Sequence, residues 1–139
     1  MAKHLIYWPV LAQILIPMVV LALNGKRKAA DRAAGTVNLT AAAMDNTAWS
    51  KPVVLTSHNL ANQTQLPVLF YVICLVLAGI DAVNTLSLGL AWAFVLSRCV
   101  HAYAHVNDNI VAVRFRSFLF GALVLLLLFV ITLAALARA

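Results

Sequence analysis

Glutamate is absent from this chain of 139 residues, and charged residues of all kinds make up only 10% of it. The four acidic residues are Asp31, Asp45, Asp81 and Asp108. Chemistry that needs a pair of carboxylates, or a membrane-embedded glutamate that carries protons, therefore has few residues to use. Soluble domains have roughly a quarter of their residues charged. The shortage of charge, with 64% hydrophobic residues, predicts an integral membrane protein.

Cysteine is also scarce, because only Cys74 and Cys99 are present. Both lie in apolar runs, where a free cysteine packs as a small hydrophobic residue. They indicate neither a redox compartment nor a thiolate metal site. The net charge of +6 does not indicate a nucleic-acid partner, because the ten Lys and Arg residues form no extended basic face with interleaved aromatics.

Four apolar segments are long enough to cross a bilayer. We expect spans at about 5–23, 60–80, 85–106 and 111–136, so that the whole chain, 1–139, forms one all-α membrane domain with a four-helix bundle. The segment 24–57 is expected to be a loop that contains short interfacial helices. The first span differs from a signal peptide because its basic cluster follows the apolar run.

Basic residues near the ends of the expected spans are distributed unequally. One side has two of them, Lys3 and Arg138, and the other side has seven: Lys26, Arg27, Lys28, Arg32, Lys51, Arg114 and Arg116. Cytoplasmic loops carry the excess of Lys and Arg. This distribution predicts that both termini lie outside the cytoplasm and that the 24–57 segment contacts anionic membrane lipids on the cytoplasmic side.

A set of polar residues, here called the polar seam, interrupts the apolar helices near their cytoplasmic ends. Its members are Asn62, Gln65, Arg98, His101, His105, Asn109 and Arg114. Residues spaced at i, i+3 and i+7, as Arg98, His101 and His105 are, share one face of a helix. Such residues are costly in a membrane unless they pair or face water, so they are candidate functional residues. The guanidinium of an arginine binds a carboxylate through two parallel hydrogen bonds, and the amide side chains of Asn and Gln pair with peptide groups. The polar seam would therefore suit a small anionic peptide such as glutathione.

The spacing of the polar seam resembles that of the MAPEG family, the membrane-associated proteins in eicosanoid and glutathione metabolism. The residues that carry the resemblance are Asn62-Gln63-Thr64-Gln65-Leu66-Pro67, then Arg98-x-x-His101-x-x-x-His105, then Arg114. The stretch NLANQTQLPVLFY resembles the bacterial branch in particular. The resemblance implies a homotrimer of four-helix subunits in a bacterial inner membrane.

The resemblance also implies an activity and its residues. It predicts a glutathione transferase or peroxidase that acts on lipophilic small molecules from the bilayer, with glutathione as co-substrate. The residues implied in glutathione binding are Asn62, Gln65, Arg98, His101 and Arg114. Arg114 would supply positive charge to the thiolate, and His105 would act as hydrogen-bond donor or proton acceptor.

Three residues depart from the family pattern. Gln65 stands where a glutamate is expected, His105 where a tyrosine is expected, and Phe115 where some members have a serine. A glutathione-binding or structural membrane protein without efficient turnover is therefore an alternative. A small transporter is another, although the spans lack a proton-coupling Asp or Glu and no internal repeat is evident.

Metal chemistry has little support in the sequence. His101 and His105 have the i, i+4 spacing of two zinc ligands, but no HExxH glutamate and no local thiolate accompany them. A haem between helices would have only His58, His101 and His105 as axial ligands on this side of the membrane. We therefore expect no metal site.

Overall fold

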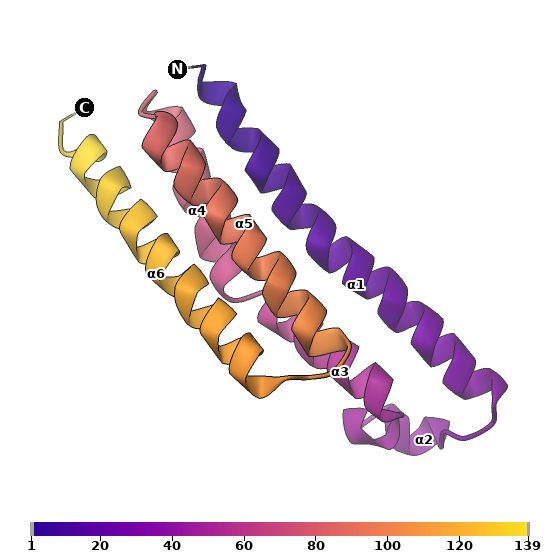
Figure 1. The fold of residues 1–139 in the computed structure, drawn as a ribbon. Helices are drawn as coiled ribbons and strands as arrows, with labels where there is room; N and C mark the ends of the chain where they lie inside the picture. Colours follow the sequence, from indigo (N-terminus) through magenta and orange to yellow (C-terminus); the bar gives the residue numbers. More distant parts are fainter. Residues whose placement is uncertain (1, 139) are drawn as a thin grey trace.

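The computed structural model describes residues 2–138, and all of their regular structure is helical. The elements are η1 (Lys3–Ile6), α1 (Tyr7–Ala33), α2 (Leu39–Ala42), η2 (Asn46–Ala48), α3 (Lys51–Asn62), α4 (Leu66–Gly79), α5 (Thr85–Val106) and α6 (Val111–Leu136). The long helices run side by side in one bundle, with both chain ends at the same end of it (Figure 1). Four helical stretches, Lys3–Ala33, Lys51–Gly79, Thr85–Val106 and Val111–Leu136, are long and apolar enough to cross a membrane.

The first helix is longer than the span expected at 5–23. The stretch Lys3–Ala33 has 31 residues, which corresponds to about 46 Å at the helical rise and exceeds a hydrocarbon core of about 30 Å. Residues 24–33, which were expected to belong to the 24–57 loop, are helical. They contain several Ala, Lys and Arg residues, which favour a helix, and no proline. The helix ends just before Gly35, whose φ is +66°.

The second span is interrupted, whereas one continuous helix was expected over 60–80. Helix α3 begins at Lys51 and ends at Asn62, and α4 restarts at Leu66. Pro67 explains the restart, because proline has no N–H and its ring clashes with the preceding turn unless it lies in the first turn of a helix. Gln65 precedes α4 with φ −99° and ψ −102°, outside the helical region.

The core of the bundle is apolar and tightly packed. Phe70 of α4 stacks on Phe94 of α5 with ring centroids 4.6 Å apart. Helices α5 and α6 are in close contact where Gly121 faces Ser97, because a Cβ built on Gly121 would lie 2.6 Å from the Ser97 Oγ. Small residues permit such close approach between helices in a membrane.

The end of the bundle opposite the chain termini is held together by Arg27. Its guanidinium donates hydrogen bonds to the Pro52 carbonyl at 2.9 Å and to the Val106 carbonyl at 3.0 Å. These bonds connect the C-terminal part of α1 to the start of α3 and the end of α5. The α5–α6 connection then turns at Asn109, whose φ of 52° is one that asparagine tolerates.

Candidate functional site: a cationic pocket between α3, α5 and α6

A cavity of about 240 Å³ lies where α3, α5 and the first turns of α6 meet. Six residues line it: Asn62, His101, Val111, Arg114, Phe115 and Phe118. Three of these, Asn62, His101 and Arg114, belong to the polar seam. The structure therefore brings together residues from three helices that are up to 52 positions apart in the sequence.

The Arg114 side chain is held by the turn that precedes its own helix. Its Nη1 donates to the Oδ1 of Asn109, and its Nε is buried without a hydrogen-bond partner among residues 2–138. A guanidinium has five N–H donors, so Arg114 keeps donors for a ligand in the pocket. Asn109, the remaining member of the seam between α5 and α6, thus positions Arg114 and does not line the cavity.

His101 is oriented by the backbone of α6. Its Nδ1 lies 3.0 Å from the Arg114 carbonyl oxygen, and because a carbonyl can only accept, Nδ1 donates. The Nε2 atom has no hydrogen-bond partner among the described residues. In the neutral ring this nitrogen carries the lone pair, so His101 keeps an unused acceptor that is enclosed by the surrounding protein.

His105 lies behind the pocket and does not line it. The side chain is only 1% exposed, and its ring meets that of His101 edge-on at 5.8 Å between centroids. The Asn62 Nδ2 lies 3.5 Å from His105 Nδ1 and is the donor of that pair. His105 therefore contacts Asn62 and His101 from within the bundle, and its expected role toward a thiol stays a prediction.

Arg98 does not line the pocket but lies next to Phe118, which does. Its side chain is fully buried, and the Nε, Nη1 and Nη2 atoms have no hydrogen-bond partner in the described part of the chain. The guanidinium lies 5.8 Å from the centroid of the Phe118 ring, which lines the cavity from above. A buried charge without a partner is destabilising, so this position indicates that the positive potential has a use.

Gln65 is not part of this pocket, although it was expected to share a helix face with Asn62. The break before Pro67 turns its side chain to the bundle surface, where it is exposed. Gln63 is buried instead, and it accepts a hydrogen bond from Gln13 at 3.3 Å and donates to Asn59 at 3.2 Å. The signal in the sequence for this buried network was Gln13, a single glutamine inside the first apolar run.

Sequence reasoning also missed the apolar half of the pocket. Val111, Phe115 and Phe118 stand at −3, +1 and +4 relative to Arg114. This spacing places them on one face of α6 with Arg114, and it was the signal that could have identified them. The other arginine of that helix, Arg116, lines a separate groove on the far side.

Metal ligation finds no support in the described residues, which contain no group of three or more His, Cys, Asp or Glu side chains able to hold an ion. No Asp lines the pocket either. The arrangement can bind an anion between Arg114 and the amide of Asn62, above the charge of Arg98, and it can accept a proton at His101.

The fold and the pocket define a class of protein, an integral membrane helical bundle with a cationic pocket at one end. The model of the MAPEG family matches residues 5–134, almost the whole chain, and the chain belongs to this family. Membership makes it a glutathione-related membrane protein at the level of the family. Comparison with curated proteins and with solved structures gave no match.

Proposed function

We propose that the chain is a glutathione-dependent membrane enzyme, of the transferase or peroxidase type, that acts on lipophilic electrophiles from the bilayer. One observation carries the proposal. Arg114 and His101 line a pocket next to the buried Arg98, which has no hydrogen-bond partner among residues 2–138, and no carboxylate lines the pocket. Glutathione has two carboxylates, one ammonium group and a thiol, so its net charge complements that pocket.

In this proposal Arg114 binds a carboxylate or the thiolate through its free N–H groups. The Asn62 amide pairs with the peptide backbone of the ligand. Phe115 and Phe118 supply an apolar wall at which a lipophilic second substrate meets the sulfur. Arg98 acts through its charge, since its nitrogen atoms are enclosed.

The reaction requires the thiolate, because the thiol itself is a poor nucleophile. We assign the acceptance of the thiol proton to His101 Nε2 in preference to His105, because His101 lines the pocket and its enclosed Nε2 has no hydrogen-bond partner among residues 2–138. The sulfur then forms a bond with the electrophilic carbon, and the leaving group departs with its electron pair. For a hydroperoxide the thiolate attacks the terminal oxygen, the O–O bond breaks, and the alcohol leaves after taking up a proton, so that glutathione becomes a sulfenic acid. The thiol of a second glutathione then displaces the sulfenic hydroxyl as water and forms the disulfide.

A conjugation assay with an apolar aryl halide, in detergent or nanodiscs, tests the proposal. Arg114→Ala should reduce kcat/KM by about tenfold to a hundredfold, as expected for the loss of a charged hydrogen bond of about 1.5–3 kcal/mol. Arg116→Ala is the matched control, because Arg116 faces a different groove, and it should retain activity within about twofold. Equal losses in the two variants would show that the arginines act only as general surface charge.

Binding of glutathione without efficient turnover is the second candidate. It is favoured by the amide of Gln65 at the position where the family resemblance places a glutamate. Ultraviolet difference spectroscopy separates the two candidates, because the enzyme must hold a detectable thiolate at pH 7–8. Saturable binding with a fully protonated thiol would support the second candidate and contradict the first.

We further propose that the protein is a homotrimer, in which the exposed Gln65 of one subunit reaches the pocket of a neighbour. An exposed amide next to a membrane-spanning helix is more stable with a hydrogen-bond partner than in hydrocarbon, which supports this arrangement. Native mass spectrometry of the purified protein should give three copies. In a trimer of this kind, Gln65→Glu should raise the pKa of the bound thiol, because the added negative charge disfavours the thiolate.

The proposed location is a bacterial inner membrane with both termini outside the cytoplasm. All seven basic residues of the larger group lie toward the end of the bundle that holds the α1–α3 and α5–α6 connections (Figure 1). Lys3 lies at the opposite end and pairs there with Asp81 at 3.1 Å. The excess of basic residues on the loop side supports a cytoplasmic position for that side and for the pocket.

A further inference from the structure

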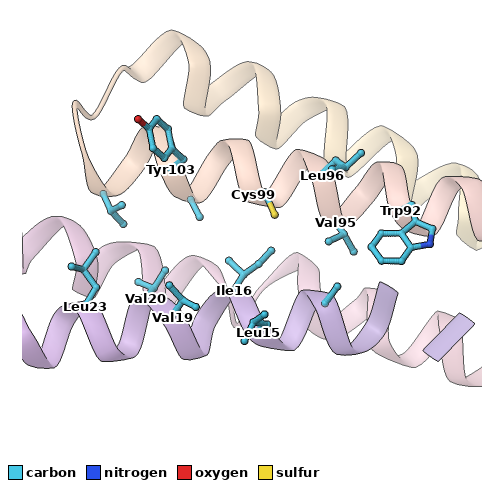
Figure 2. A pocket seen from close by; sticks show the side chains of 13 residues that line it. Leu15, Ile16, Val19, Val20, Leu23, Trp92, Val95, Leu96, Cys99 and Tyr103 are labelled. Carbon is cyan, nitrogen blue, oxygen red and sulfur yellow. The ribbon is translucent and has the colours of Figure 1, made fainter. Parts of the chain in front are cut away.

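An apolar groove runs along the outside of the bundle between α1 and α5. Its volume is about 470 Å³. Figure 2 shows the side chains of the two helices facing one another across it, from Trp92 toward Tyr103. The α5 residues that line it extend from Trp92 to Val106, a distance of about 21 Å at the helical rise. The groove is therefore long, narrow and suited to one extended hydrocarbon chain.

A second cavity of about 400 Å³ lies next to the groove at the loop end, and Val106 lines both. Arg27 lines this second cavity one helical turn beyond Leu23, which lines the groove. Its other charged residues are Lys51 and Asp108. Two cations and one carboxylate give the cavity a net positive charge.

The cations of this second cavity are available to a ligand. Arg27 uses Nη1 and Nη2 to bind backbone carbonyls, so several of its five N–H donors are free. Lys51 is exposed and has no hydrogen-bond or ion-pair partner among residues 2–138. Basic cavities between helices on the cytoplasmic side bind the headgroups of anionic lipids.

We propose that the groove and the basic cavity together form a binding site for one anionic phospholipid of the inner leaflet. An acyl chain occupies the α1–α5 groove, and the phosphate headgroup lies between Arg27 and Lys51. The site is separate from the cationic pocket, because the two share no lining residue. The lipid would connect the three helices that Arg27 already joins.

Native mass spectrometry of the full chain, titrated in detergent with phosphatidylglycerol or with phosphatidylcholine of the same acyl chains, tests the site. Lys51→Gln should weaken binding of phosphatidylglycerol by about fivefold, as expected for the loss of one basic residue near a headgroup, and should leave phosphatidylcholine unchanged. The matched control is Lys26→Gln, since Lys26 is exposed on the same extension of α1 but does not line the cavity. This control should change binding by less than twofold.

A second pair of variants tests the groove. Val19 lines it and is 58% exposed, so Val19→Trp should fold and should weaken the binding of both lipids. Leu21→Trp is the control, because Leu21 is 61% exposed on α1 and lies outside the groove. Equal retention of the two lipids by the unaltered chain, or equal effects of Lys51→Gln and Lys26→Gln, would overturn the proposal. A loss of subunits in Val19→Trp with unchanged lipid binding would also overturn it, because the groove would then hold a neighbouring chain.

Discussion

Replacement of the buried arginine by an apolar side chain, Arg98→Met, should separate stability from ligand binding. The guanidinium is fully buried, and its three nitrogen atoms have no partner among the described residues. Removal of a buried ionic group in favour of apolar packing is neutral or stabilising by about 1–4 kcal/mol. Loss of the cation–π contact with Phe118 reduces this gain in stability by about 0.5–2 kcal/mol. We therefore expect the ligand-free variant to be as stable as the parent chain or more stable by about 2 kcal/mol.

The effect of the same substitution on binding follows from the position of Phe118. The Arg98 guanidinium lies 5.8 Å from the centre of that ring, so a carboxylate in contact with the opposite face would be about 9 Å from the charge. With an effective dielectric constant of about 20, the attraction is about 2 kcal/mol, which is about thirtyfold in affinity. Arg98→Met should weaken glutathione binding by about that factor.

Thermal unfolding in nanodiscs with and without glutathione measures both the stability of the ligand-free protein and its affinity for glutathione, because a ligand that binds only the folded state raises the unfolding temperature. Arg116→Met is the control, since Arg116 is exposed and faces another groove. Arg116→Met should change neither the stability of the ligand-free protein nor its affinity for glutathione appreciably. A ligand-free Arg98→Met variant that is destabilised by more than about 2 kcal/mol, with unchanged affinity for glutathione, would refute the reasoning and assign Arg98 a purely structural role.

Three further predictions concern the fold. A reporter that is active only in the cytoplasm should be silent when fused to the C-terminus and active when inserted in the 34–50 segment; the reverse pattern would contradict the proposed orientation. Gly121→Ala should destabilise the bundle by about 1–3 kcal/mol by overpacking, because its Cβ would lie 2.6 Å from the Ser97 Oγ, and Ser97→Ala should restore part of the loss in denaturant unfolding. Gln13→Leu should cost about 1–3 kcal/mol because it leaves the buried Gln63 carbonyl oxygen unpaired, and an equally stable variant would show that the glutamine pair is dispensable.

The expected spans at 85–106 and 111–136 coincide with α5 and α6, because long apolar runs bounded by Asn84 and by the 107–110 turn leave few alternatives. The first two spans could not be predicted as well. Hydropathy falls at the charged residues after Leu23, but it does not show that α1 continues as a helix through them to Ala33. Pro67 explains a restart of the second span, but the position of the break also depends on the packing of its neighbours.

In the candidate site, too, the sequence predicted which residues share a helix face but not which of them line a cavity. The helical spacing of Arg98, His101 and His105 placed them correctly on one helix, but it could not decide which of them faces a cavity. That depends on α6, whose Arg114 carbonyl orients His101 while Phe118 covers Arg98. Gln65, expected beside Asn62 on one helix face, is exposed because the helix breaks between Asn62 and Leu66, and the buried glutamine is Gln63. Spacing along one helix could not predict this break.

The central claim is that the pocket at Arg114 binds glutathione, and a calorimetric titration of the purified protein in nanodiscs tests it most directly. The account predicts saturable binding with one type of site, and an affinity that falls by about 1.5–3 kcal/mol in Arg114→Ala while Arg116→Ala binds as the parent chain does. Absence of saturable binding at millimolar glutathione, or binding that Arg114→Ala leaves unchanged, would contradict the account.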